Sequence, residues 1–450
     1  MRFVQSETAG LANWKARGPG ILAFARLDET AHPLPRMSRF VFISLVLFVQ
    51  CATAAVDPAA SGKAVADLAT WLNATGEKAP LDKAGFASVP LTKADAERAR
   101  TILWDAHAAR IRAERAAEVK AKVIELNGLK MKFDTLSFGD PAHPPAGGRS
   151  LFISMHGGGG APAAVNESQW ENQVRLGKGY RPEEGIYLAP RAPTDSWNMW
   201  HQAHIDSFFD RLIEDFVVLE NVNPNRVYIL GYSAGGDGVY QLGPRMADRL
   251  AAAAMMAGHP NSACPFGLRN IGFCIQVGAN DDGYGRNKVA EKWGKRLDDL
   301  AKADPGGYAH FTELHAGKGH WMDMADRKAI PWMEKFTRNP IPEKIAWHQD
   351  GVIHPSFYWL AVEKENAHAG DEITAERHAQ AITLTGQGPA ALTVRLNDAM
   401  LDLDQPVTIT WEGKQVFAGL APRTIATLAS TCETRGDPGL TFSAEVKVNR

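Results

Sequence analysis

Cysteine is scarce in this sequence, with four residues in a chain of 450. A disulfide-rich scaffold is therefore excluded, and the cysteines and histidines show no spacing typical of a zinc site, so we expect no metal. Cys264 and Cys274 could form one disulfide in an oxidising compartment, but their spacing alone does not establish it.

A surplus of either charge is also absent, because 49 lysines and arginines face 51 aspartates and glutamates. No block of like charge stands out, so we expect no nucleic-acid partner. No apolar run reaches the roughly 20 residues that a helix needs to cross a bilayer. We therefore expect no stable membrane insertion once a leader has been removed.

A leader is indicated near the beginning of the chain, at about residues 37–55. This stretch has a basic start that ends at Arg39, then an apolar run, then a group of small residues, which is the order of a secretory signal. We interpret residues 1–55 as leader and signal peptide. We expect cleavage near Ala55 and a secreted or periplasmic mature protein.

Two segments with different patterns follow the leader. Residues 56–127 predict helices, and the stretch 92–126 within them is rich in Ala, Glu, Arg and Lys. In residues 128–339, short apolar runs alternate with helical stretches. This alternation predicts an α/β fold, with a largely parallel sheet covered by helices on both faces. The apolar runs lie at 151–155, 186–188, 227–230, 252–256, 271–277 and 310–314.

The pattern changes again from residue 340, where short β-rich segments replace the helical periodicity. Pro340 and Pro342 stand at the change and would end a helix there. We expect residues 340–450 to fold independently as a C-terminal β-sandwich domain that contributes no catalytic group.

The strongest chemical signal is the motif Gly231–Gly235, with the sequence GYSAG. It comes directly after an apolar run and directly before a helical stretch. A sharp strand-to-helix turn of this kind raises the Ser233 hydroxyl above the sheet, and the glycines permit close packing. The context predicts Ser233 as a nucleophile.

A second glycine-rich motif, HGGGG, begins at His156 after the apolar run 151–155. An oxyanion hole needs backbone N–H groups that point at one spot, and glycine permits that approach. We therefore expect one oxyanion donor from Gly157 or Gly158. The other is expected from Ala234, the residue after the nucleophile.

A nucleophilic serine needs a base, and the base needs an acid that orients it. Asp281 and Asp282 follow the apolar run 271–277, and His320 follows the run 310–314. Strand ends meet at one edge of a parallel sheet, so these groups can converge on the serine. We expect His320 as the base and Asp281 as the acid. Asp282 stays open as an alternative that more simply caps the following helix.

The motifs HGGGG, GYSAGG, GAND and GKGHW, in this order, resemble the α/β-hydrolase superfamily. Within it they are most similar to secreted esterases of the feruloyl esterase and polyhydroxybutyrate depolymerase type, over about residues 128–337. The resemblance implies an α/β-hydrolase fold, an acyl-serine mechanism and no cofactor. Neither glycine motif fixes the acyl group, so the ester substrate could be a small molecule or a polymer.

The substrate contacts and the reaction class leave alternatives open. Trp197 and Trp200 are candidate substrate-binding residues, because aromatic faces stack on sugar or phenyl rings, but core packing explains them equally well. A serine peptidase of the prolyl-oligopeptidase type would share this sheet and these residues. A non-catalytic binding protein on a hydrolase fold is the alternative from another class.

Overall fold

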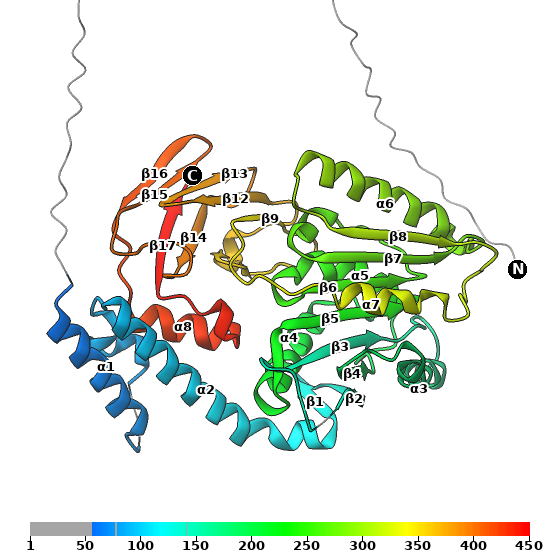
Figure 1. The fold of residues 1–450 in the computed structure, drawn as a ribbon, viewed down its shortest axis with the longest axis horizontal. Helices are drawn as coiled ribbons and strands as arrows, with labels where there is room; N and C mark the ends of the chain where they lie inside the picture. Colours follow the sequence, from blue (N-terminus) through cyan, green and yellow to red (C-terminus); the bar gives the residue numbers. More distant parts are fainter. Residues whose placement is uncertain (1–55, 77–78, 141) are drawn as a thin grey trace, which may run out of the picture. The chain divides into compact units, whose positions relative to one another are not determined.

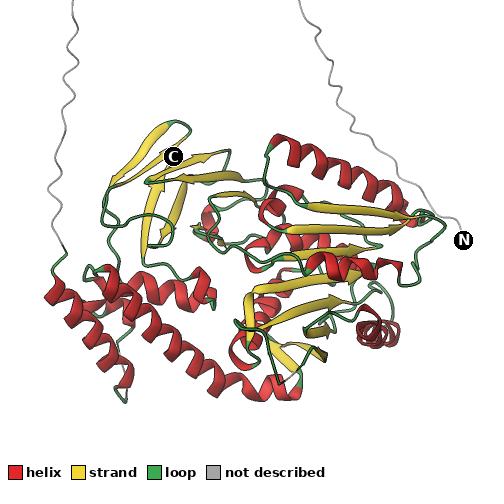
Figure 2. Cartoon of the chain, viewed as in Figure 1, coloured by secondary structure: helices red, strands yellow, loops and turns green. Residues whose placement is uncertain are grey.

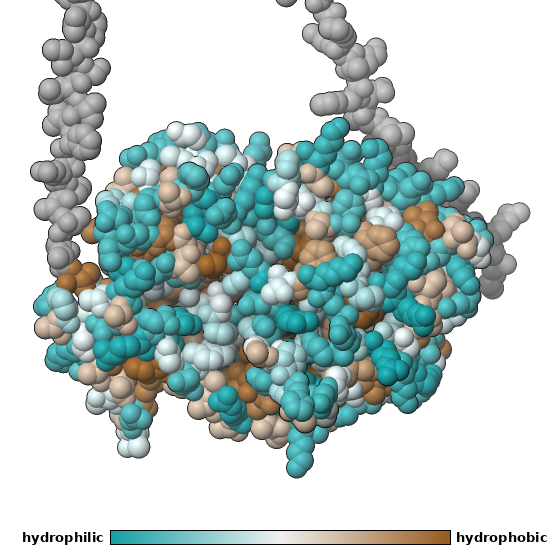
Figure 3. Space-filling model, in the orientation of Figure 1, coloured by the Kyte–Doolittle hydropathy of each residue, from teal (hydrophilic) through white to brown (hydrophobic). Residues whose placement is uncertain are grey.

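The computed structural model describes residues 56–76, 79–140 and 142–450 (Figure 1). The expected leader and signal peptide, residues 1–55, lie outside these described residues. None of the described helices combines the length and apolar character needed to cross a membrane. The face shown in Figure 3 is mostly hydrophilic, with hydrophobic side chains in small scattered groups.

An eight-stranded sheet forms the centre of the region between residues 123 and 315. Its order is β1-β2-β4-β3-β5-β6-β7-β8, and all neighbours from β4 to β8 run parallel, whereas β1 and β2 pair antiparallel. The central strands are buried on both faces, which explains why they appear in the sequence as continuous apolar runs. The strands are β1 Val123–Leu126, β2 Leu129–Phe138, β3 Arg149–Met155, β4 Gly185–Pro190, β5 Val222–Tyr232, β6 Ala252–Met256, β7 Gly272–Gly278 and β8 His310–His315.

Helices cover both faces of this sheet (Figures 1 and 2). Adjacent residues of β3 point to opposite faces: Ile153 packs in the same cluster as Tyr240 of α5, and Phe152 packs with Tyr180 of α3. Helices α4, α5 and α6 lie on the first face, and α3 and α7 on the second. This arrangement confirms the predicted α/β-hydrolase fold. The helices are α3 Ala163–Tyr180, α4 Ala203–Leu219, α5 Ala234–Arg245, α6 Arg286–Ala303 and α7 Ala329–Met333.

The helix predicted over 92–126 ends five residues earlier than expected. Helix α2, Lys93–Ala121, ends where Lys122 takes a left-handed conformation with φ 56°. The next four residues form β1, which pairs with β2 at the edge of the sheet. Four residues are too few for periodicity to separate a strand from the end of a helix, so the sequence alone misplaced this boundary.

The N-terminal helices pack against a helix from the far end of the chain. Leu103 of α2 lies in one apolar cluster with Leu428 of α8. His107 of α2 hydrogen-bonds Glu214 of α4 at 2.6 Å and Glu433 of α8 at 3.2 Å. Burial lowers the pKa of His107, but the bonds to both carboxylates outweigh it and raise that pKa to about 9. The charged imidazole therefore joins three helices. The remaining helices are α1 Pro58–Asn73 and α8 Ile425–Arg435.

The C-terminal region contains the two expected β-sheets. One has the order β10-β11-β14-β17 and the other β16-β15-β13-β12-β9. Trp347 and Phe357 stack with ring centroids 5.8 Å apart, and both are buried, so these aromatics pack the interior. Helix α8 was not anticipated in this region. The strands are β9 Lys344–His348, β10 Ser356–Phe357, β11 Leu360–Ala361, β12 Glu372–His378, β13 Ala381–Thr385, β14 Ala391–Leu396, β15 Val407–Trp411, β16 Lys414–Gly419 and β17 Ala444–Asn449.

Buried ion pairs connect residues on either side of position 340. The Asp437 carboxylate lies 2.7 Å from the Arg338 guanidinium and 3.4 Å from that of Arg249. Asp248 in turn pairs with Arg435. Residues 340–450 therefore make charged contacts with residues 128–339. The independent folding of residues 340–450 stays a prediction.

We expect Asp437→Ala to lower the free energy of unfolding by roughly 3–5 kcal/mol, because it leaves two buried guanidinium groups without their shared carboxylate. Urea unfolding at pH 7 measures this change. The control is Glu445→Ala, an exposed carboxylate on β17, which should change stability by less than about 0.5 kcal/mol. Equal effects of the two substitutions would show that the buried pairs do not hold this junction.

Candidate active site

Ser233 occupies a strained turn between β5 and α5. Its backbone has φ 56° and ψ −119°, a conformation that residues with a side chain rarely adopt. The Ser233 N–H donates to the Met256 carbonyl of β6 at 2.9 Å, which ties the turn to the neighbouring strand. Glycine is required at 235, because a Cβ there would overlap the Met155 carbonyl oxygen. The sequence-predicted strand–turn–helix context is therefore present around Ser233.

Three sequence-predicted side chains meet at the carboxyl edge of the sheet. His320 Nε2 lies 3.0 Å from Ser233 Oγ, and His320 Nδ1 lies 2.8 Å from Asp281 Oδ2. An ionised carboxylate only accepts hydrogen bonds, so Nδ1–H donates to Asp281. Nε2 is then free to accept the Ser233 hydroxyl proton. The chain from Asp281 through His320 to Ser233 can thus withdraw a proton from the serine.

The two neighbouring aspartates have different surroundings. Asp281 leaves only 3% of its side chain exposed, and its N–H donates to the Gly278 carbonyl at 3.0 Å in the turn after β7. Asp282 is exposed and precedes the short helix η5, Gly283–Gly285, without making a side-chain capping bond. The prediction that Asp282 caps the following helix is therefore wrong. This residue takes an αR conformation, and the N-cap of α6 is Gly285.

Tyr232 holds the loop that carries the base, and the sequence analysis did not identify it. Its hydroxyl donates to the His320 carbonyl at 2.6 Å and accepts the Met322 N–H at 3.0 Å. Burial raises the pKa of Tyr232 far above its ordinary value, so the hydroxyl keeps its proton. Tyr232 is the residue before the serine in the GYSAG motif. The segment that carries Ser233 therefore also carries the hydroxyl that holds the His320 loop.

The glycine-rich loop after β3 lies directly beside Ser233. A Cβ on Gly157 would stand 3.2 Å from Ser233 Cβ, and a Cβ on Gly158, at φ 102°, would overlap Asn166 Oδ1. Asn166 is fully buried and accepts the Gly159 N–H at 2.8 Å, so it fixes the path of this loop. Side chains at 157 and 158 would displace the loop from the serine.

His156 fixes the orientation of the first peptide in this loop. Its Nδ1–H donates to the Gly157 carbonyl at 2.6 Å, and its Nε2 accepts the Ala192 N–H at 3.1 Å. Burial is the main cause that lowers the pKa of His156, to about 4, so the ring is neutral as these bonds require. In a trans peptide the N–H points opposite to the carbonyl. The Gly158 N–H is therefore directed away from His156.

A pocket of about 360 Å³ opens above Ser233. It is bounded by the glycine loop, the start of α5 and two exposed aromatic side chains, Trp197 and Tyr284, which are 63% and 83% exposed. Arg286 stacks on the Tyr284 ring at 4.8 Å and reaches within 3.6 Å of Asp281. The lining residues are Gly158, Gly159, Trp197, Ser233, Ala234, Asp237, His259, Asn261, Tyr284 and Arg286.

The two candidate substrate-binding tryptophans have different surroundings in the structure. Trp197 lines the pocket, as the aromatic-wall interpretation requires. Trp200 is fully buried, and its Nε1–H donates to the His156 carbonyl at 2.9 Å. A substrate contact by Trp200 is therefore excluded in this conformation. Its ring instead supports the base of the glycine loop.

A half-buried carboxylate lies one turn along α5 from the serine. Asp237 accepts the His259 N–H at 2.6 Å, and its own N–H donates to the Ser233 carbonyl at 3.0 Å. Burial raises the pKa of Asp237, opposed by the His259 N–H and by the charge of Arg286. Asp237 thus anchors the loop that carries His259 and Asn261 into the pocket wall.

The three described cysteines, Cys264, Cys274 and Cys432, do not line this pocket. Cys264 and Cys274 are free thiols, so the disulfide considered from the sequence is absent between them. Within the described part of the chain, the one group of three His, Cys, Asp or Glu side chains close enough to share a metal ion is Cys264, His348 and Glu372, outside the pocket lining.

No family model and no curated protein matches the chain. Several solved structures are similar to it. A thermostable esterase is 18% identical with a TM-score of 0.36, over 48% of this chain and 62% of that one, so the chain spans less than two thirds of that esterase's length. A Bacillus cereus carboxylesterase is 15% identical with a TM-score of 0.34, over 51% and 98% of the two chains. A feruloyl esterase module from Clostridium thermocellum is 12% identical with a TM-score of 0.31, over 47% and 90%. Likenesses this distant carry no argument about activity.

Proposed function

We propose that this protein is an exported serine hydrolase that cleaves carboxylic esters through an acyl-serine intermediate. The observation that carries the proposal is the hydrogen-bonded chain from Asp281 through His320 to Ser233, set at a strained strand-to-helix turn. A buried carboxylate, an imidazole and a hydroxyl in this order form the catalytic triad of acyl-transfer enzymes. Export rests on the signal-like order of residues 37–55.

In this mechanism the Ser233 oxygen attacks the ester carbonyl carbon while His320 Nε2 takes the hydroxyl proton. The Asp281 carboxylate stabilises the resulting imidazolium. When the tetrahedral intermediate collapses, the alcohol leaves with the proton from His320 and the acyl group stays on Ser233. Water, deprotonated by His320, then attacks the acyl-serine and releases the acid.

The negative charge of each tetrahedral intermediate needs fixed donors. We assign the Ala234 N–H, at the start of α5, and an N–H of the glycine loop at Gly157 or Gly158. The N-terminus of α5 also favours negative charge at this position. The hydrogen bond from His156 to the Gly157 carbonyl favours Gly158 as the loop donor, because it fixes that peptide.

We expect Gly158→Ala to lower kcat by roughly 100- to 1,000-fold, since the new Cβ overlaps Asn166 and moves an oxyanion donor. Steady-state kinetics on a p-nitrophenyl ester measures the loss. The matched control is Gly319→Ala, beside His320, where a Cβ meets nothing within 4 Å. An unchanged kcat in folded Gly158→Ala would exclude this loop as the donor.

Trp197 and Tyr284 are proposed to bind a flat or ring-shaped part of the ester. We expect Trp197→Ala and Tyr284→Ala each to lower kcat/KM for an aryl ester by about 2- to 10-fold, the size of one aromatic contact. Hydrolysis of a small acetate ester by the same variants is the internal control and should not change. Equal losses on both esters would mean that these rings only shape the site.

The reaction class is tested with a substrate panel and a covalent probe. The panel holds p-nitrophenyl esters of increasing acyl length, a feruloyl ester and a prolyl peptide. Turnover of esters without cleavage of the peptide supports the proposal, and the reverse supports a peptidase. A fluorophosphonate probe should label Ser233 and fail on Ser233→Ala. A folded wild-type protein that takes no label would be a binding protein instead.

Export is tested separately, by N-terminal sequencing of the protein recovered outside the cytoplasm. A mature start near Ala55 is expected. A chain that still begins at Met1 would refute the proposed signal.

A further inference from the structure

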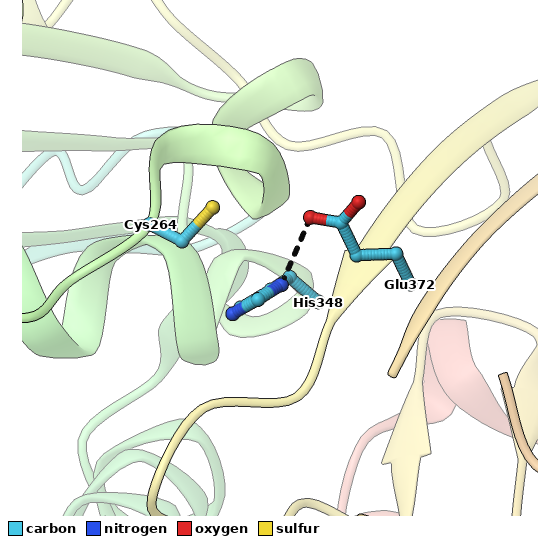
Figure 4. Close-up of side chains that lie close together, drawn as sticks. All are labelled: Cys264, His348 and Glu372. Carbon is cyan, nitrogen blue, oxygen red and sulfur yellow. Dashed lines mark hydrogen bonds and ion pairs between the residues drawn. The ribbon is translucent and has the colours of Figure 1, made fainter. Parts of the chain in front are cut away.

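Three side chains from distant parts of the sequence converge beside the C-terminal sheet (Figure 4). Cys264 comes from the loop before the short helix η4, Pro265–Asn270, and His348 and Glu372 come from β9 and β12. The ligand atoms of all three lie within 4.8 Å of one another. They therefore surround one small space.

The backbone holds these groups in place. His348 and Glu372 are directly opposite residues in the antiparallel β9–β12 pair, so their side chains share one face of the sheet. Helix η4 is joined to β9 by side-chain hydrogen bonds, in which Arg269 and Asn270 donate to the Lys344 carbonyl at 3.3 and 3.0 Å. The cysteine loop is thus held against the strand that carries His348.

The spacing of this cluster fits a metal centre as well as an ion pair, and its chemistry adds a third ligand type. His348 Nδ1 and Glu372 Oε1 are 3.1 Å apart, near the edge length of a tetrahedron with bonds of about 2.0–2.1 Å around zinc. A histidine–carboxylate pair explains two of the groups, but not the sulfur placed beside both. Thiolate, imidazole and carboxylate together are typical zinc ligands, whereas calcium and magnesium select oxygen.

A cation beside the cluster is compatible with this assignment. Arg296 Nη2 of α6 lies 3.8 Å from Cys264 Sγ and can donate a hydrogen bond to the sulfur. An N–H donor to a bound thiolate is an outer-shell contact that orients the ligand. With Cys264 and Glu372 both deprotonated, the charges of the ligands balance a divalent ion.

We propose that Cys264, His348 and Glu372 bind one zinc ion, with a water molecule in the fourth position. Binding forms bonds from the metal to the Cys264 sulfur, to His348 Nδ1 and to a Glu372 oxygen. The thiol proton passes to solvent, and the imidazole proton moves from Nδ1 to Nε2, so that His348 stays neutral. The ion joins the cysteine loop to the C-terminal sheet. Because His259 and Asn261 of the same loop line the pocket above Ser233, zinc also steadies one wall of that pocket.

Cobalt(II) provides a direct spectroscopic test with the full-length protein after treatment with a chelator. We expect one equivalent of Co²⁺ to produce a thiolate-to-cobalt charge-transfer band, and Zn²⁺ to abolish it. Cys264→Ser should lose the band. His348→Gln and Glu372→Gln should weaken binding by roughly 100-fold or more, because even outer-shell partners cost about 10- to 100-fold.

The control variant is His378→Gln, which removes an exposed histidine from the same strand as Glu372 and should bind Co²⁺ like the wild type. Zinc should raise the melting temperature of the wild type and of this control but not that of His348→Gln, and Mg²⁺ should have no effect. No charge-transfer band in the wild type, or equal metal affinity in Cys264→Ser, would overturn the proposal.

A second measurement needs no variant, in case Cys264→Ser does not fold. Cys264 is partly exposed, whereas Cys274 and Cys432 are buried. Iodoacetamide should therefore alkylate Cys264 in the chelator-treated wild type, and zinc should protect it, as read by peptide mass mapping. Alkylation at the same rate with and without zinc would equally refute the site.

Discussion

Ser233→Ala and His320→Ala should each lower kcat for ester hydrolysis by roughly 10⁵- to 10⁶-fold, because the members of a triad act as one unit and losing either removes the activated nucleophile. The KM should change much less, since neither substitution alters the aromatic side chains of the pocket. Single-turnover and steady-state rates on a p-nitrophenyl ester measure the loss, and circular dichroism and thermal unfolding establish that each variant is folded.

The structure favours intact folding of Ser233→Ala. Alanine and serine have the same restrictions at φ 56°, so the backbone strain of the turn does not increase. Ser207→Ala, at an exposed position on α4, is the matched control and should keep full activity. A folded Ser233→Ala that turns over substrate at near wild-type rates would remove Ser233 from the mechanism.

Asp281→Asn should lower kcat by roughly 10⁴-fold, because an amide in place of the carboxylate favours the wrong tautomer of His320 and no longer stabilises its cation. Asp282→Asn should change kcat by no more than a few-fold, since this exposed residue makes no bond to the histidine. Both variants make the same change, from a carboxylate to an amide, at adjacent positions. Comparison of their kcat values therefore isolates the group that contacts His320.

Asp281 also lies 3.6 Å from Arg286, so a structural loss must be separated from a catalytic one. Thermal unfolding of Asp281→Asn provides this separation, because a purely structural loss of activity requires that most of the variant be unfolded at the assay temperature. A larger kcat loss in Asp282→Asn than in Asp281→Asn would reverse the assignment.

Local signals made the central sheet predictable from the sequence. Parallel strands covered on both faces must be apolar, so β3 to β7 each contain an apolar run, whereas the edge strand β8 mixes polar and apolar residues. The edge strand β1 and its neighbour β2 carry mixed polar and apolar residues, so they contain no continuous apolar run that predicts a strand. Helix α8, a short run of small and polar residues, was missed for the same reason.

The sequence by itself determined which chemistry is available at the sheet edge. A strand–glycine–serine–glycine–helix order imposes a sharp turn wherever it folds, and a parallel sheet brings the segments after β7 and β8 to the same edge as that turn. Ser233, Asp281 and His320 could therefore be predicted from the sequence alone. Their assignment required only strand order and local pattern.

Only the tertiary structure decided which residues surround that chemistry. Whether Trp197 or Trp200 reaches a substrate depends on which ring the packing buries, and Trp200 is the one beneath the glycine loop. Three other features also join residues that lie far apart in the chain. They are the hydrogen bond from Tyr232 to the His320 carbonyl, the ion pair of Asp437 with Arg338, and the cluster of Cys264, His348 and Glu372. Such contacts have no spacing rule in the sequence, because folding alone sets the distance between their partners.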